Sequence, residues 1–196
     1  MNELGAPVLY AIVTGSPAAR DVGKLVESAQ AEGWVVCVIA SPDGLRFIDV
    51  DGLEARTGYP VRSRYKDPGT PDVLPPADAM IVAPITCNSL AKWAAGISDT
   101  LPVGLLVEAV GKRLPVVAVP FSNRAQLGFP AIQDAVRKLS EWGVTVHVYE
   151  QHEPGTGENS LHLFPWEKSW RALLAHPWHA TYTFGRLETH AHEGNR

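Results

Sequence analysis

The fold is decided by the stretch AMIVAPITCNSLAKWAAGISDTL, residues 79–101. Its first five residues form an apolar run without polar alternation, which predicts a strand that is buried on both faces and ended by Pro84. A helix is predicted to follow and to end near Gly96, because glycine suits a helix terminus. The apolar face of that helix comprises Leu90, Trp93, Ala94 and Ile97.

Short polar side chains occupy the junction between this strand and this helix, namely Thr86, Asn88 and Ser89. Open α/β sheets bind anionic ligands where the carboxyl end of a strand opens into a helix N-terminus, because free backbone N–H groups face the ligand there. The same residues are equally expected in an ordinary strand–helix connection with an N-cap. The pattern alone leaves both interpretations open.

Length and composition favour one folded domain. The 196 residues are 45% hydrophobic, and we expect a single domain over residues 1–175 and a C-terminal tail over residues 176–196. A net charge of −4 offers no basic surface for nucleic acid or an anionic membrane, and no apolar run approaches the ~20 residues of a membrane span. Because residues 1–4 lack the basic region of a signal peptide and two cysteines make no disulfide framework, a cytoplasmic protein is expected.

Apolar runs alternate with helical patterns along the rest of the chain. An apolar run over residues 8–13 precedes Thr-Gly-Ser at residues 14–16 and a helix over residues 18–32. Four prolines between residues 65 and 76 exclude helix and central strand there. This rhythm predicts a three-layer, Rossmann-like α/β sandwich with a mostly parallel sheet. Further strands are expected over residues 34–40, 61–64, 115–120 and 144–149, and further helices over residues 52–57, 102–110, 130–142 and around 166–174.

The loops that follow the predicted strands carry small and polar residues. In a parallel sheet these loops meet at one edge, where a ligand site is expected. The N-terminal loop has a single glycine and no Walker lysine, so a nicotinamide or P-loop site is a poor fit. The residues expected at this edge are Gly15, Ser16, Ser41, Thr86, Cys87, Asn88 and Asn123.

Residues 83–99 carry a more specific pattern, A-P-x-T-x-N-x-x-A-K-x-A-x-G-I-x-D. It resembles the signature of the homo-oligomeric flavin-containing cysteine decarboxylases, a family that includes phosphopantothenoylcysteine decarboxylase and the lantibiotic-type peptidyl-cysteine decarboxylases. Residues 14–19 resemble the phosphate loop of that family, and Pro-Phe-Ser-Asn at residues 120–123 stands where the family has Pro-Ala-Met-Asn. The similarity covers about residues 8–146.

The resemblance implies an FMN cofactor at the edge described above. Gly15 and Ser16 would hold its phosphate, Ser41 would lie near the ribityl chain, and residues 83–88 would line the isoalloxazine, with Ile85 or Trp93 as an apolar wall. It also implies a homotrimer, or a multiple of trimers, with residues 101–110 as candidates for the subunit contact. The cofactor-binding set implied in this way is Gly15, Ser16, Ser41, Ala83, Pro84, Thr86, Asn88 and Asp99.

The chain departs from the family pattern where catalysis is concerned. The family carries a histidine in the loop before the central strand, but Thr70 or a neighbour takes that place here and no histidine precedes His147. A threonine hydroxyl cannot act as a general base near neutral pH. The cysteine-bearing flap of the family is not recognisable in residues 151–159, whereas Asn123, used near the substrate carboxylate, is retained. The cofactor site is therefore expected to persist without the usual decarboxylation apparatus.

The catalytic candidates are Asn123 and Cys87, of which Cys87 is either a thiol acting on flavin or substrate or a small buried side chain. The histidines at positions 176, 179, 190 and 192 lack matching carboxylates or thiolates, so no metal is predicted. Three functions remain open. They are a flavin-dependent decarboxylase or oxidoreductase for a cysteine-like or other small or peptide carboxylate, a flavin prenyltransferase-like protein, and an FMN-binding protein without decarboxylase activity.

Overall fold

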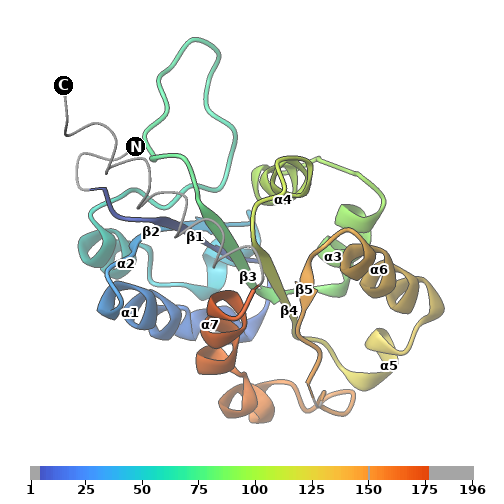
Figure 1. Ribbon diagram of the computed structural model, residues 1–196. Coiled ribbons are helices and arrows are strands. Elements are labelled where there is room, and N and C mark those ends of the chain that lie inside the picture. The colour runs from blue at the N-terminus through green and yellow to red at the C-terminus, as the bar shows by residue number, and fades with distance from the viewer. Residues whose placement is uncertain (1–4, 150, 177–196) are drawn as a thin grey trace, which may run out of the picture.

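A five-stranded parallel sheet forms the centre of the molecule (Figure 1). The computed structural model describes residues 5–149 and 151–176. The strand order is β2-β1-β3-β4-β5, and every neighbouring pair is parallel. The strands are β1 (Val8–Val13), β2 (Val35–Ala40), β3 (Ala79–Ile85), β4 (Val116–Pro120) and β5 (Thr145–Val146).

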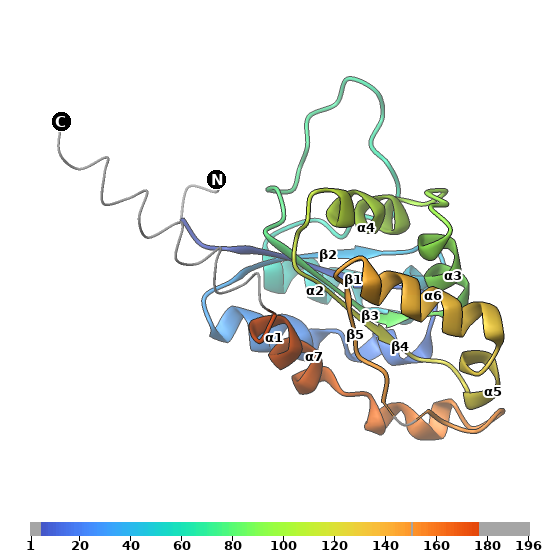
Figure 2. The same ribbon diagram turned by 45° about the vertical axis from the view of Figure 1, so that its right-hand side comes forward.

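Helices cover both faces of the sheet, which confirms the predicted three-layer α/β sandwich (Figure 2). One hydrophobic cluster joins the sheet to α1, α2 and α7, and a second joins the other face to α3, α4 and α6. The helices are α1 (Gly23–Ala31), α2 (Val50–Thr57), α3 (Cys87–Ala94), α4 (Leu101–Gly111), α5 (Arg124–Leu127), α6 (Pro130–Glu141) and α7 (Trp166–Leu174), with 3₁₀ turns η1 (Pro17–Asp21), η2 (Gly44–Phe47) and η3 (Glu158–Leu163).

The three central strands have no polar alternation because neither face meets water. Every residue of β1, β3 and β4 is buried, and successive residues of β1 enter opposite clusters. Continuous apolar runs are typical of parallel strands covered on both sides. The prediction of buried strands from residues 8–13, 79–83 and 115–120 is confirmed.

Three strand boundaries differ from the sequence prediction. Strand β3 does not end at Pro84 but continues to Ile85, because the pairing with β4 shifts register between Val82 and Ile85 and accommodates the proline, which has no N–H. Residues 61–64 form only one bridge, between Ile39 and Arg62, before the proline-rich segment turns away. Strand β5 is only two residues long rather than spanning residues 144–149.

Glycines in the left-handed region end two helices as predicted. Gly33 (φ +82°) follows α1, and Gly96 (φ +72°) follows α3. The predicted helix over residues 18–32 is split into η1 and α1, although the apolar residues expected to face the sheet are all buried, namely Val22, Leu25, Val26 and Ala29. Ile97 was predicted on the apolar face of α3, but it lies past Gly96 and is 47% exposed.

Helix α7 brings the C-terminal segment onto the first helix. Trp170 is fully buried, its indole Nε1 donates a hydrogen bond to Glu32 Oε1 at 2.9 Å, and its ring meets Trp34 edge to face. His176 ends the described segment buried, with its ring Nε2 3.2 Å from the Gly143 carbonyl oxygen. Within the described residues, none of the helices has the length and apolar character needed to cross a membrane.

Replacement of Trp170 by alanine is expected to lower the free energy of unfolding by ~3–5 kcal/mol, because it opens a cavity in the layer between α1 and α7. Urea titration followed by circular dichroism measures this change. Trp142→Ala is the control, since Trp142 is 49% exposed, and it should cost less than ~1 kcal/mol. Equal losses in the two variants would contradict the assignment of Trp170 to the core.

Candidate functional site

Two adjoining cavities lie at the carboxyl edge of the sheet. The first cavity has a volume of about 300 Å³ and the second about 340 Å³, and Gly15, Thr86 and Asn88 line both. They are therefore two halves of one cleft. The other residues of the first cavity are Ser41, Pro42, Asp43, Ser89, Lys92, Thr100 and Val103. The other residues of the second cavity are Ser16, Pro17, Cys87, Phe121, Ser122, Asn123, Gln126, His152 and Gly157.

Thr14 joins the ends of β1 and β3 beneath this cleft. Its backbone N–H donates to the Pro84 carbonyl oxygen at 3.0 Å, and its hydroxyl donates to the same oxygen at 3.2 Å. The hydroxyl also accepts a hydrogen bond from the Thr86 N–H at 2.8 Å. Thr14 begins the predicted phosphate loop but was not among the predicted site residues, although a hydroxyl directly after a buried strand is a signal for such a role.

The N-terminal loop approaches the cleft with its backbone. A Cβ on Gly15 would lie 2.8 Å from the Asp43 Cβ, so only glycine lets these two loops lie so close together. Ser16 is 2% exposed, and its hydroxyl has no hydrogen-bond partner within the described chain. A buried hydroxyl without a partner is costly, so this atom is expected to pair with something that enters the cleft.

Ser41 and the start of α3 form the remaining polar wall of the first cavity. The Ser41 hydroxyl accepts from the Gly44 N–H at 3.0 Å. Thr86 is the N-cap of α3, its hydroxyl accepting from the Ser89 N–H at 3.3 Å, so the capping interpretation of this junction is correct. Asn88 makes no capping bond and stays exposed between the two cavities. Thr86 thus caps α3, while the Asn88 side chain beside it remains accessible from the cleft.

Three of the residues predicted to bind the cofactor, Ala83, Pro84 and Asp99, do not line the cleft. Ala83 and Pro84 are buried within β3 and line neither cavity. Asp99 also lies outside both cavities, and its carboxylate pairs with the Lys92 ammonium at 2.5 Å. Lys92 itself lines the first cavity. Through this pair, Asp99 positions a cation at the cleft.

The prediction that Ile85 or Trp93 forms an apolar wall beside the isoalloxazine ring is wrong, because neither residue lines the cleft. Ile85 is 0% exposed and Trp93 is 1% exposed, because both side chains pack in the core between the sheet and α3. The apolar surface of the second cavity is instead supplied by Phe121, which directly follows β4.

Asn123 and Cys87, the predicted catalytic pair, lie together on the second cavity. The Asn123 Oδ1 atom accepts from the Gln126 N–H at 2.9 Å, which fixes the amide at the start of α5. The Cys87 thiol lies 3.0 Å from the Ser122 hydroxyl and donates to it. Burial raises the pKa of the Cys87 thiol, although the hydrogen bond with Ser122 opposes this shift. Cys87 is therefore a protonated thiol near neutral pH rather than a thiolate nucleophile.

His152, which was not among the predicted site residues, also lines the second cavity. Its ring lies against Phe121, with ring centroids 5.0 Å apart. No local pattern around His152 indicates a functional residue. Only the return of the chain after β5 brings it to the cleft.

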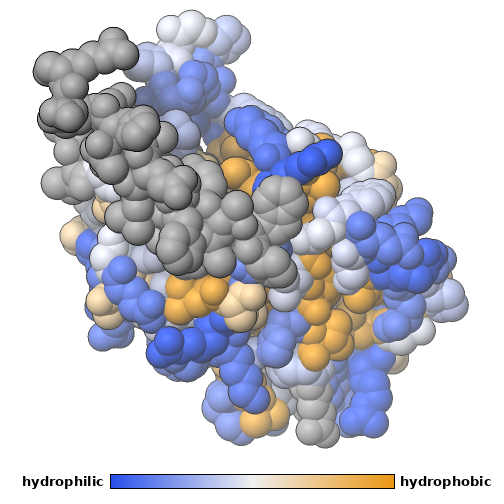
Figure 3. Space-filling view, in the orientation of Figure 1, coloured by the Kyte–Doolittle hydropathy of each residue, from blue (hydrophilic) through white to orange (hydrophobic). Residues whose placement is uncertain are grey.

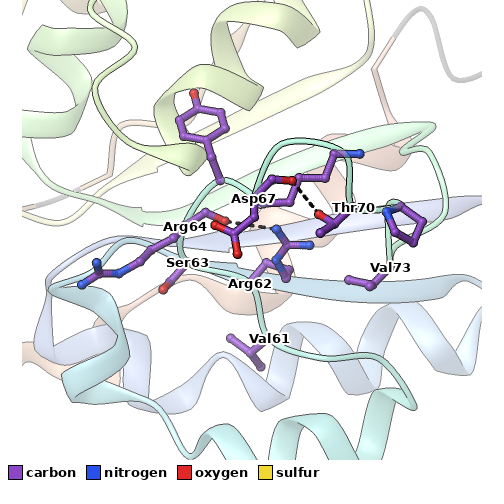
Figure 4. A pocket seen from close by; sticks show the side chains of 10 residues that line it. Val61, Arg62, Ser63, Arg64, Asp67, Thr70 and Val73 are labelled. Carbon is purple, nitrogen blue, oxygen red and sulfur yellow. Dashed lines mark hydrogen bonds between the residues drawn. The ribbon is translucent and has the colours of Figure 1, made fainter.

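Thr70, which the resemblance puts at or next to the place of the family histidine, lines a different pocket (Figure 4). This pocket of about 440 Å³ lies beside the proline-rich segment and carries Arg62, Arg64 and Lys66 together with Asp67. The Thr70 hydroxyl donates to the Asp67 carbonyl oxygen at 2.7 Å. Thr70 does not reach the two cavities of its own chain.

No group of three or more potential metal ligands converges among residues 5–149 and 151–176. Of the four C-terminal histidines considered as ligands, His176 is packed against Gly143 and the other three lie outside the described residues. The side chains that line the cleft carry hydroxyls, amides, one imidazole, one ammonium group, one thiol and the Asp43 carboxylate, beside apolar groups.

The fold is that of a parallel α/β protein, and a polar cleft lies at the carboxyl edge of its sheet. The Flavoprotein family profile matches residues 2–161, so the chain belongs to the Flavoprotein family. The resemblance found in residues 83–99 is thereby confirmed.

Sequence relatives include the Coenzyme A biosynthesis bifunctional protein CoaBC. The protein from Mycobacterium bovis is 34% identical over 149 residues, which are 74% of this chain and 34% of the relative. The protein from Thermococcus kodakarensis is 28% identical over 148 residues, which are 72% of this chain and 36% of the relative. The chain thus spans about a third of the length of these curated relatives.

Solved structures share the fold at lower identity. The epidermin biosynthesis protein EpiD from Staphylococcus aureus has a TM-score of 0.63 and 24% identity, with 73% of this chain and 83% of that chain covered. A PPC decarboxylase variant complexed with pantothenoylaminoethenethiol has a TM-score of 0.61 and 22% identity, with 78% and 87% covered. These likenesses confirm the Rossmann-like α/β fold.

Alkylation of Cys87 by iodoacetamide at pH 7 is expected to be slower than that of free N-acetylcysteine and to accelerate as the pH rises. The raised pKa leaves less thiolate at neutral pH, and the thiolate is the reactive species. Peptide mass spectrometry measures the rate, and Cys87→Ser reports the background from the fully buried Cys37. Faster alkylation of Cys87 than of N-acetylcysteine at pH 7 would show an activated thiol instead.

Proposed function

We propose that this chain is an FMN-binding protein whose cofactor occupies the two adjoining cavities at the carboxyl edge of the sheet. The observation that carries the proposal is the buried Ser16 hydroxyl, which lacks a partner and lines the cleft next to Gly15. A phosphate accepts hydrogen bonds from hydroxyls and from the backbone N–H groups of such a loop. The membership of the chain in the Flavoprotein family supports the same cofactor.

The first cavity suits the phosphate and ribityl chain of FMN. The Ser41 hydroxyl of the first cavity and the Ser16 hydroxyl of the adjoining second cavity would donate to phosphate or ribityl oxygens where the two cavities meet. The Ser41 hydroxyl can do so while it accepts from the Gly44 N–H. Lys92, held by Asp99, would add a positive charge near the phosphate, and neither member of this ion pair is buried. In this assignment Thr86 and Asn88 contact the cofactor. Ala83 and Pro84 in β3 and Asp99 beside Lys92 position the residues that line the cleft without touching the cofactor.

The second cavity suits the isoalloxazine ring and a small carboxylated substrate. Phe121 supplies an apolar surface, and the Asn123 amide N–H₂ remains available because only its oxygen is used in capping α5. An amide donor there can orient a substrate carboxylate. Bound FMN would supply two-electron oxidation of a thiol carboxylate, the chemistry that precedes loss of carbon dioxide in cysteine decarboxylation.

We therefore favour a flavin-dependent lyase or oxidoreductase acting on a cysteine-like molecule or peptide. An FMN-binding protein without decarboxylase activity is the second candidate, and the place of Thr70 in a separate pocket favours it. A flavin prenyltransferase-like protein has less support. Its phosphate-rich substrate needs cations, and the Arg124 guanidinium beside the cleft is already paired with Glu153 at 3.2 Å.

The purified protein is expected to be yellow and to release FMN on denaturation, and Ser16→Ala is expected to weaken FMN binding ~10-fold or more. The reason is the loss of a hydrogen bond to a charged phosphate, which contributes ~1.5–3 kcal/mol. Fluorescence titration of the apoprotein measures the Kd, and Ser98→Ala, at an exposed position outside the cleft, is the control. A colourless protein that takes up no added FMN would refute the cofactor assignment.

We further propose a homotrimer or a multiple of trimers, with α4 at the subunit contact. Unlike the other helices, α4 has apolar side chains around nearly its whole circumference, and apolar surface lies at and beside it in Figure 3. Such a helix is normally buried. Its half-buried apolar residues are Leu101, Leu105, Val107 and Val110.

Light scattering of the wild type is expected to give three times the chain mass or a multiple of it. Leu105→Asp is expected to shift the protein to smaller species, because a carboxylate would be buried in the contact. Lys24→Asp, on the exposed surface of α1 across the sheet, should leave the assembly unchanged. A wild-type monomer that holds FMN at micromolar concentration would contradict the proposed trimer.

A further inference from the structure

We propose that His152 is the acid–base residue of this cleft and takes the thiol proton of the substrate. The inference rests on the proposed function, since it assigns a role toward the thiol carboxylate of that site. It concerns a residue of the segment after β5, whereas the loop before β3 carries no imidazole in this chain. The juxtaposition of His152, Asn123 and Cys87 on one cavity is the observation behind it.

The segment that carries His152 is fixed onto the loop after β4. The Arg124 N–H donates to the His152 carbonyl oxygen at 2.9 Å, and the Ser122 N–H donates to the Gln151 side-chain oxygen at 3.2 Å. The ion pair between Arg124 and Glu153 reinforces the same contact. His152 is therefore held beside Asn123 by three interactions between distant parts of the sequence.

The imidazole ring is also held in one orientation. Its Nδ1 atom lies 2.8 Å from the Glu153 carbonyl oxygen, which can only accept, so the neutral ring carries its hydrogen on Nδ1. The Nε2 atom then has a free lone pair. Phe121 lies on one side, and a Cβ on Gly157 would lie 3.1 Å from the His152 Cε1 atom, so the absence of a side chain there makes room for the ring.

The other groups of the cleft are poorly suited to accept a proton near neutral pH. The Cys87 thiol has a raised pKa and donates its hydrogen to Ser122, so it is not available as a thiolate. Lys92 is a cation paired with Asp99. Asp43 lines only the first cavity, where it is exposed. The remaining lining residues carry hydroxyls, amides or apolar groups, which do not titrate in this range.

The proposed step is a proton transfer. The S–H bond of the substrate breaks, its electron pair remains on sulfur, and the proton forms a bond to the His152 Nε2 atom. The resulting imidazolium keeps its Nδ1 hydrogen bond to the Glu153 carbonyl oxygen. No electrons are exchanged in this step, and the Asn123 amide orients the carboxylate meanwhile. Removing such a group typically lowers the rate by ~10²–10⁴-fold.

The test compares His152→Gln with His162→Gln, because His162 is an exposed histidine of the same segment outside both cavities. Both variants are expected to bind FMN like the wild type. With N-acetylcysteine and cysteine-ended peptides as probes, His152→Gln should lose ~10²-fold or more of anaerobic flavin bleaching and carbon dioxide release. His152→Ala should regain part of its rate with added imidazole, and His162→Gln should keep the full rate.

A second readout does not depend on turnover. Ring ¹H–¹³C NMR should show a change at His152 and none at His162 when N-acetylcysteine is added to the FMN-loaded protein. Full bleaching activity in His152→Gln, or no change of the His152 resonance with the thiol bound, would overturn the role of His152. Failure of the wild type to bind FMN would instead refute the proposed function, so the two failures are distinguishable.

Discussion

The carboxyl edge of the sheet depends on the hydrogen bonds of Thr14. Its hydroxyl and N–H bind the Pro84 carbonyl oxygen, and the hydroxyl also receives the Thr86 N–H. One side chain thereby sets the end of β1 against the end of β3, at the point where Pro84 interrupts regular pairing. Gly15, Ser16 and the start of α3 reach the cleft from the two ends joined in this way. The placement of the polar groups that these two loops bring to the cleft follows from this junction.

The fold was largely predictable because its strands are buried on both faces. Residues 79–83 and 8–13 have no polar alternation, and glycines such as Gly33 and Gly96 end helices in the left-handed region. Strand ends were less predictable. Strand β3 continues past Pro84 because it pairs there with β4, and the residues next to Pro84 in the sequence do not reveal that pairing.

The candidate site was predictable where it lies in loops that directly follow strands. The alternation of strands and helices along the sequence was enough to place Gly15, Ser41, Asn88 and Asn123 at one edge of a parallel sheet. His152 could not, because it reaches the cleft through contacts with Ser122 and Arg124 that are about 30 residues away in sequence. Trp93 was misassigned for a related reason, since helical spacing does not tell a core face from a ligand-facing one.

A crystal structure of the protein with FMN tests the proposed cofactor site most directly. We predict a phosphate oxygen within about 2.5–3.0 Å of the Ser16 hydroxyl and the isoalloxazine ring between Asn88 and Phe121. The Thr14 hydrogen bonds to Pro84 and Thr86 should remain as they are without the cofactor. An FMN molecule bound elsewhere, or a Ser16 hydroxyl that remains without a partner in the complex, would contradict the proposed site.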